Sequence, residues 1–107
     1  MQPQKIQMEA ELLSVLAQQT RLKILYFLRD GEKCACEIHP FMLEDASVIS
    51  RHLVKMKEAG LLDAHREGVS IYYRIAEPRI FDLLAKADEI IKSTALERAR
   101  RTQEVFP

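Results

Sequence analysis

The sequence predicts a mainly α-helical fold with one small β-hairpin, built as a single domain over residues 1–107. Apolar residues recur at helical spacing through most of the chain. The three glycines, Gly31, Gly60 and Gly68, each stand where such a segment stops, and a run rich in Val, Ile and Tyr follows the last of them. A chain of 107 residues has room for one modest hydrophobic core.

The first two helices are expected over residues 7–18 and 20–30. Apolar side chains cover much of the circumference of the second, so we expect it to lie in the core. Thr20 is placed to cap the N-terminus of this helix, and Gly31 follows its last residue, where glycine commonly ends a helix.

The next two helices are expected over residues 36–43 and 46–59. The first should be short or kinked, because Pro40 lacks an N–H and disfavours helix at the residue before it. The second ends before Gly60 and has an apolar face and a polar face.

A hairpin and a long helix complete the chain. Residues 61–66 and 69–75 flank Glu67-Gly68, and the second of these runs is typical of a strand. In the last predicted helix, residues 79–100, apolar residues recur at the spacing of a buried seam. Because this seam is long for so small a core, we expect the first and last helices to form a homodimer interface, with packing inside one chain as the alternative.

The two helices before Gly60 predict a helix-turn-helix, in which the second helix enters the major groove of DNA and the hairpin is a wing. Arginine suits guanine edges and phosphates, lysine suits phosphates, and serine suits either. The outward side chains expected to contact DNA are Ser47, Ser50, Arg51, Lys55 and His52. A solvated helix face is the alternative for this set, and for His52 we favour a partly buried role that holds the motif together.

Both cysteines lie just ahead of this motif, one residue apart. Cys34 and Cys36, with His39, form a candidate set of two thiolates and one imidazole for a soft ion such as As(III), Cd(II) or Zn(II), which the fold itself does not require. On a regular helix the two cysteines would point about 200° apart, so they can share an ion only where the backbone is irregular. A redox switch, buried packing cysteines and a catalytic nucleophile are the other interpretations.

Composition excludes several classes of protein. Sixteen basic and sixteen acidic side chains cancel, so any case for nucleic acid rests on local charge, which is basic in residues 46–60. We find no nucleophile motif or glycine-rich phosphate loop, and therefore predict that the protein is not an enzyme. No apolar run approaches the roughly 20 residues that span a bilayer, and no secretory pattern opens the chain, so we expect a cytoplasmic protein.

Five motifs follow one another along the chain: AQQTRLKIL at residues 17–25, CACEI at 34–38, VISRHL at 48–53, EAGLL at 58–62, and EG through YYRI at 67–75. In this order and spacing they resemble the ArsR/SmtB family of metal- and metalloid-responsive winged-helix repressors. The resemblance covers about residues 10–95. The predicted fold is therefore a winged helix-turn-helix.

The resemblance implies a homodimer bridged by the first and last helices, which reads an inverted-repeat operator in double-stranded DNA and releases it when an inducer binds. It marks as DNA-contacting positions Ser47, Ser50, Arg51 and His52 of the recognition helix, and residues 66–73 of the wing, which include Arg66 and Tyr72. A winged helix that docks on a protein partner in place of DNA is the alternative from another class.

The sequence departs from the family pattern in its ligands and in its recognition helix. Arsenite-responsive members resemble Cys-x-Cys-x-x-Cys, and His39 stands at the third position here. The N-terminal arm has no cysteine and the last helix no histidine, so the cysteine segment is the expected sensor. Asp45-Ala46 stands where many members carry Ser-Gln, and there Asp45 is expected to serve as a helix N-cap.

Overall fold

The computed structural model describes residues 2–105, and the side chains of residues 2–103. The chain forms two compact units, Met1–Glu77 and Pro78–Pro107. In residues 2–105, no helix is both long and apolar enough to cross a membrane.

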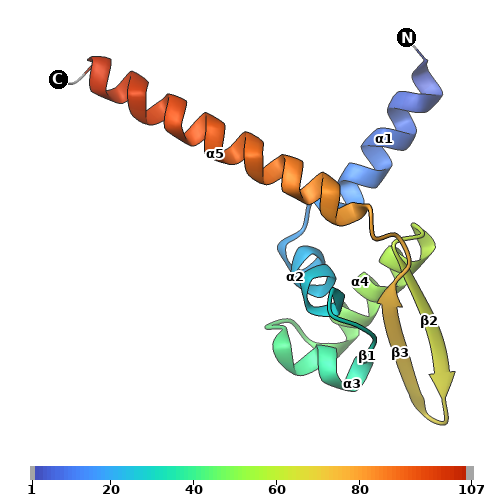
Figure 1. Cartoon of the computed structure of the whole chain (residues 1–107). Coiled ribbons are helices and arrows are strands. Elements are labelled where there is room, and N and C mark those ends of the chain that lie inside the picture. Colours follow the sequence, from blue (N-terminus) through green and yellow to red (C-terminus); the bar gives the residue numbers. More distant parts are fainter. Residues whose placement is uncertain (1, 106–107) are drawn as a thin grey trace. The chain divides into compact units, whose positions relative to one another are not determined.

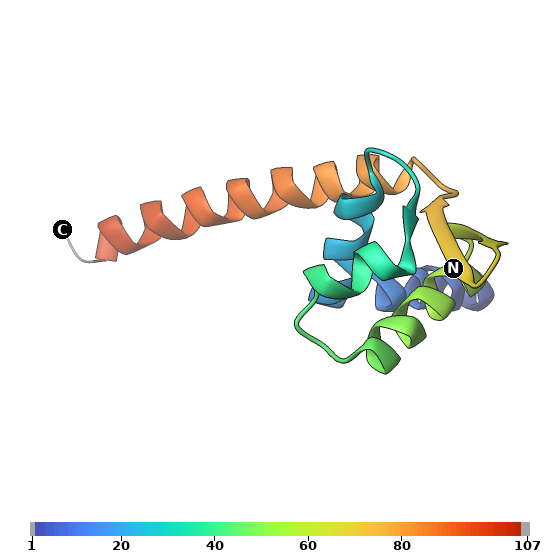
Figure 2. The same cartoon turned by 90° about the horizontal axis from the view of Figure 1, so that it is seen from below.

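The first unit contains the helix-turn-helix and the wing (Figure 1). Its elements, in chain order, are α1 (Pro3–Leu16), α2 (Gln19–Leu28), β1 (Lys33–Cys34), α3 (Ala35–Ile38), the 3-10 turn η1 (His39–Phe41), α4 (Ala46–Glu58), β2 (Leu62–Glu67) and β3 (Ser70–Ile75). From below, the extended turn that joins η1 to α4 is visible (Figure 2). A single helix was predicted over residues 36–43. The structure divides this segment into α3 and η1, and η1 contains Pro40.

Two helix starts differ from the prediction. Helix α1 begins at Pro3, because proline fits the first turn of a helix, where its missing N–H has no partner to lose. Thr20 does not cap α2, and that prediction is wrong. Gln18 occupies the cap position, without a side-chain hydrogen bond, and the Thr20 hydroxyl donates to Glu44.

The wing belongs to a three-stranded antiparallel sheet in the order β1-β3-β2. The central strand β3 pairs Tyr72 with Cys34 of β1 on one side and with His65 of β2 on the other. Gly68 has a φ of 62° and takes the first central position of the two-residue turn, as glycine does in type II′ hairpins. Val69 at this turn is 96% exposed, so it does not pack on the helices.

The core of the first unit lies between α2, α4 and the sheet. Its fully buried side chains are Ile24, Leu25, Leu28, Ile38, Ile49, Leu53, Met56 and Leu62. This confirms α2 as a core helix. Helix α4 ends at Glu58, and Gly60 just beyond it has a φ of 82°, which lets the Leu61 N–H reach back to the Met56 carbonyl at 3.0 Å.

The second unit contains α5 (Ile80–Val105), which continues beyond the predicted end at residue 100. Ion pairs one turn apart support the added length: Glu97 contacts Arg100 at 2.5 Å and Arg101 at 3.7 Å. Large apolar side chains on this helix, among them Ile90, Ile91 and Leu96, are exposed.

Candidate nucleic-acid interface and cysteine pair

Helix α4 presents a polar face to solvent. Its buried side chains are Ile49, His52, Leu53 and Met56. The predicted residues Ser47, Ser50 and Arg51 are exposed on the opposite face, where the structure brings them together. Their hydroxyl and guanidinium groups are free to meet base edges and phosphates.

The two ends of α4 are set by different groups. The Asp45 carbonyl accepts from the N–H groups of Val48 and Ile49, both at 3.0 Å, so Asp45 occupies the N-cap position as predicted. Its side chain makes no cap hydrogen bond. Lys55 and Lys57 lie in the last turn, where the helix dipole favours positive charge.

Lys55 lies at the edge of the outward face. Its ammonium is 3.9 Å from Glu58, and both side chains are well exposed. Lys55 also lines a hollow between α4 and the apolar side of α1, with Met8, Glu11, Leu12, Val15, Glu58 and Ala59. It therefore points toward the α1 side of the recognition helix.

His52 lies inside the helix-turn-helix, with an exposed fraction of 8%. Arg21 Nε donates to His52 Nδ1 at 2.9 Å, and His52 Nε2 lies 3.2 Å from Glu44 Oε2. An arginine nitrogen only donates, so Nδ1 is the acceptor and Nε2 carries the proton that it donates to Glu44. Both ring nitrogens are therefore occupied within the protein.

Thr20, Arg21, Glu44 and His52 form a polar relay that ties α2 and the turn to the recognition helix. The hydrogen bond from the Thr20 hydroxyl, and then that from His52, lowers the pKa of Glu44 below its ordinary value. Arg21 also donates to the Val15 carbonyl at 3.2 Å, which ties the end of α1 to the same group. Sequence reasoning missed Arg21 and Glu44, although Arg21 is a charged residue in a helix that was expected to lie in the core.

The cysteine pair lies at the junction of β1 and α3. Cys34 has extended backbone, with φ −67° and ψ 145°, and α3 begins at the next residue. The two cysteines were expected to meet only where the backbone is irregular, and here the extended backbone at Cys34 lets both side chains converge: the Sγ atoms of Cys34 and Cys36 are in disulfide contact, with Cα atoms 5.1 Å apart. Cys34 is 3% exposed, and Cys36 is exposed.

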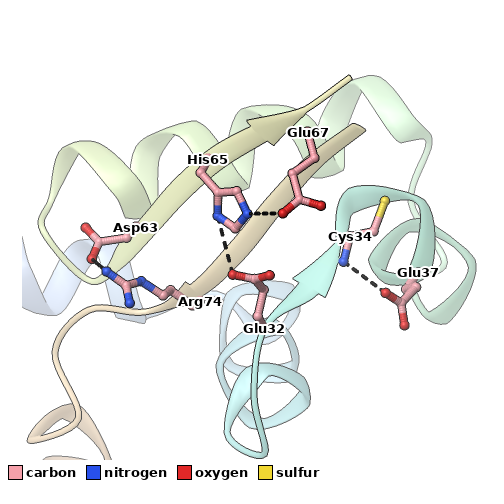
Figure 3. A network of polar contacts seen from close by, with 7 residues as sticks. All are labelled: Glu32, Cys34, Glu37, Asp63, His65, Glu67 and Arg74. Carbon is pink, nitrogen blue, oxygen red and sulfur yellow. Dashed lines mark hydrogen bonds and ion pairs between the residues drawn. The ribbon is translucent and has the colours of Figure 1, made fainter. Parts of the chain in front are cut away.

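Cys34 is also the N-cap of α3. Its Sγ accepts from the Cys36 N–H at 3.1 Å. Its own N–H donates to Glu37 Oε1 at 3.0 Å, as Figure 3 shows. This reciprocal pair is a capping box built on sulfur. A change at the Cys34 sulfur therefore acts directly on the start of α3.

The structure does not bring His39 to the two cysteines as a third ligand. In the side chains of residues 2–103, no group of three His, Cys, Asp or Glu residues is placed to hold a metal. His39 is half-buried at the start of η1, and its Nε2 is buried without a hydrogen-bond partner.

The wing carries the predicted residues Arg66 and Tyr72. Arg66 is exposed on β2. Tyr72 is half-buried and stacks on His65, with ring centroids 5.5 Å apart and an interplanar angle of 13°. His65 in turn lies 3.3 Å from both Glu32 and Glu67, so two carboxylates surround it on the surface of the sheet (Figure 3).

Comparisons with known proteins agree with this arrangement. The model of the family described as bacterial regulatory protein, arsR family, matches residues 18–64, which run from α2 to β2. An uncharacterized HTH-type transcriptional regulator of Methanocaldococcus jannaschii is 32% identical over 88 residues, 81% of this chain and 99% of that protein. The arsenical resistance operon repressor of Escherichia coli is 36% identical over 67 residues, 62% of this chain and 57% of that repressor.

Solved structures show the same architecture. The homodimeric winged helix-turn-helix DNA-binding domain of a possible ArsR-family transcriptional regulator from Mycobacterium bovis matches with a TM-score of 0.69 and 31% identity. The match covers 81% of this chain and 81% of that one. With its helix-turn-helix, its wing and these relatives, the chain belongs to the ArsR family of DNA-binding transcriptional regulators.

Proposed function

We propose that this protein is a homodimeric repressor that releases its operator when Cys34 and Cys36 bind a thiophilic metal or metalloid, such as arsenite or cadmium. The chain acts as one winged helix-turn-helix domain with dimerisation helices at both ends. One observation supports the proposal above the others: the two sulfurs converge on the segment that joins the sheet of the wing to the helix-turn-helix.

The charge of α4 supports binding to DNA. Its cations are Arg51, Lys55 and Lys57, and Glu58 is its acidic residue. The chain as a whole has a formal net charge of zero, so positive charge is concentrated where the fold presents an outward helix face. Phosphate contacts from such a face position a protein on the duplex, and side chains in the groove read the bases.

The chemistry of the cysteine pair supports a soft inducer. Thiolates select thiophilic ions over hard cations. Two thiols and arsenous acid form two As–S bonds and release two water molecules, which leaves one As–OH. A relative of this chain is the arsenical resistance operon repressor of Escherichia coli. His39 remains a proposed third ligand, and binding there would require η1 to move.

Both DNA-reading elements are linked to Cys34 by short paths. Its sulfur caps α3, which precedes the turn and α4. Its backbone lies opposite Tyr72 of β3, the central strand of the wing sheet. A metal on the sulfur would replace the hydrogen bond from Cys36 and shift α3 and β1 together, which supplies the coupling free energy between the two sites.

A redox switch of the same fold is the second candidate, and the disulfide contact between Cys34 and Cys36 favours it. A cellular oxidant would take two electrons and two protons from the two thiols, and the two sulfurs would then form a disulfide bond. The same two paths would then carry the change to α4 and the wing.

The test is fluorescence anisotropy of the reduced protein on a duplex from upstream of its own gene, titrated separately with arsenite, cadmium, zinc and a thiol oxidant. Release by a metal or by arsenite supports the first candidate, and release by the oxidant alone supports the second. A Cys34→Ser/Cys36→Ser protein should bind DNA and ignore every inducer. Normal release from that variant would contradict both mechanisms, and no DNA binding at all would favour a protein-interaction module.

A further inference from the structure

We infer that Val54 of the recognition helix reads the operator by packing on the C5-methyl group of a thymine. The inference rests on the proposed binding of α4 to DNA. It adds a residue to the predicted contacts, which were all polar or charged.

The position of Val54 follows from the helical repeat. Residues four and seven positions after Ser47 fall in one row with it, because each residue turns the helix by about 100°. Arg51 and Val54 occupy those positions, and all three residues are exposed. The buried side chains of α4 lie on the other side of the helix.

The two flanks of this row are occupied by other parts of the first unit. Lys55 lines the hollow on the α1 side. Lys57 lines a second hollow on the sheet side, with Glu32, Asp63, Ala64, His65 and Arg74. Val54 lies between these flanks and opposite the buried residues of α4, on the side of the helix that a DNA groove would meet.

The first unit leaves the apolar side chain of Val54 about half exposed in this row. Val54 is 47% exposed, while the other members of the row are Ser47, Arg51 and, at the end of the helix, Glu58, whose carboxylate is 3.9 Å from the Lys55 ammonium. Valine is also a weaker helix former than alanine or lysine, so helix stability does not favour it at an exposed position. Its two methyl groups can bury apolar surface only against an apolar partner.

The major groove offers one such partner. Thymine presents a C5-methyl there, whereas guanine, cytosine and adenine present hydrogen-bond donors and acceptors at their edges. Arg51 lies in the same row as Val54, and Lys55 and Lys57 lie on its two flanks, so the charge around this face favours a polyanion over an apolar protein surface as its occupant. Val54 therefore distinguishes thymine at one position of each half-site.

The experiment uses the full-length reduced protein and a duplex that it selects from a randomised DNA library. Each thymine of that duplex is then replaced in turn by deoxyuridine, which removes only the methyl group. At one thymine in each half-site the wild-type protein should lose about fourfold in affinity, the value of one buried methyl-sized group. Val54→Ala should bind thymine and uracil equally there.

Lys55→Ala is the matched control. It should weaken binding to every duplex and keep the thymine-to-uracil ratio, because it removes charge and no apolar contact. The inference is overturned if Val54→Ala retains the wild-type ratio, or if no single thymine matters to the wild type. It is also overturned if Val54→Ala separates the dimer in size-exclusion chromatography, which would assign Val54 to a contact between two copies. If no duplex is selected, the proposed function itself fails.

Discussion

Arg21 donates from Nε to Nδ1 of His52 at 2.9 Å, across 31 residues of sequence. This bond fixes the histidine tautomer and turns its other nitrogen toward Glu44. The recognition helix is thus held against α2 by directional polar contacts as well as by apolar packing, and its orientation depends on groups that do not face DNA.

Removal of the imidazole should destabilise the protein. His52→Ala leaves the Arg21 Nε and Glu44 without their partner in a partly buried position, so we expect a loss of about 1–3 kcal/mol in the free energy of unfolding. His52→Asn is the control, because its amide oxygen can still accept from Arg21, and it should lose less. Urea unfolding followed by circular dichroism measures both, and equal stabilities for the two variants would contradict the relay.

Stability should fall in acid through Glu44. Folding lowers the pKa of this carboxyl, mainly through the hydrogen bond from Thr20, so the folded state favours the carboxylate. The contribution is complete above the ordinary carboxyl pKa of about 4.3, and it is lost as the pH falls through the lower folded value.

Thermal unfolding of Glu44→Gln between about pH 6 and pH 3 tests this linkage. The variant should show a shallower decline in Tm with acid than the wild type. Glu58→Gln removes an exposed carboxylate that pairs with Lys55, and it should keep the wild-type slope. Parallel curves for the wild type and Glu44→Gln would disprove the assignment.

The sulfur cap of α3 predicts different effects for two substitutions of Cys34. Alanine removes the acceptor of the Cys36 N–H and should cost about 0.5–2 kcal/mol, whereas serine supplies a hydroxyl that accepts the same hydrogen bond. Cys36→Ala, at an exposed site, should change stability by less than about 0.5 kcal/mol. Reduced proteins compared by chemical denaturation measure these values, and the cap is refuted if Cys34→Ala matches Cys34→Ser.

Arg51 should dominate the DNA affinity of α4. If its guanidinium meets a guanine edge, Arg51→Ala costs about 1–3 kcal/mol and relaxes the sequence preference at one position. Lys86→Ala is a charge-matched control on α5, where Lys86 pairs with Glu89 at 3.2 Å. Anisotropy on the selected duplex at several salt concentrations compares them, and a similar loss for both variants would argue against α4 as the reader.

Local sequence signals predicted most of the elements. Apolar spacing placed α2 and α4, Gly68 placed the wing turn, and Pro40 indicated the broken helix beside the cysteines. These features depend on residues a few positions apart, so they can be read without knowledge of the fold. Helix α5 extends beyond its apolar seam. There the ion pairs of Glu97 with Arg100 and Arg101 stabilise the helix in place of apolar packing.

By itself, the sequence determined the helix-turn-helix, the wing and the place of the cysteine pair within them. Only the tertiary structure decided that Thr20 meets Glu44 across 24 residues and that Arg21 meets His52 across 31. It also decided that Lys33–Cys34 is a strand, since two residues show no periodicity and become a strand only by pairing with β3. Local propensity acts over a turn or two of chain, whereas these contacts exist only after folding brings distant segments together.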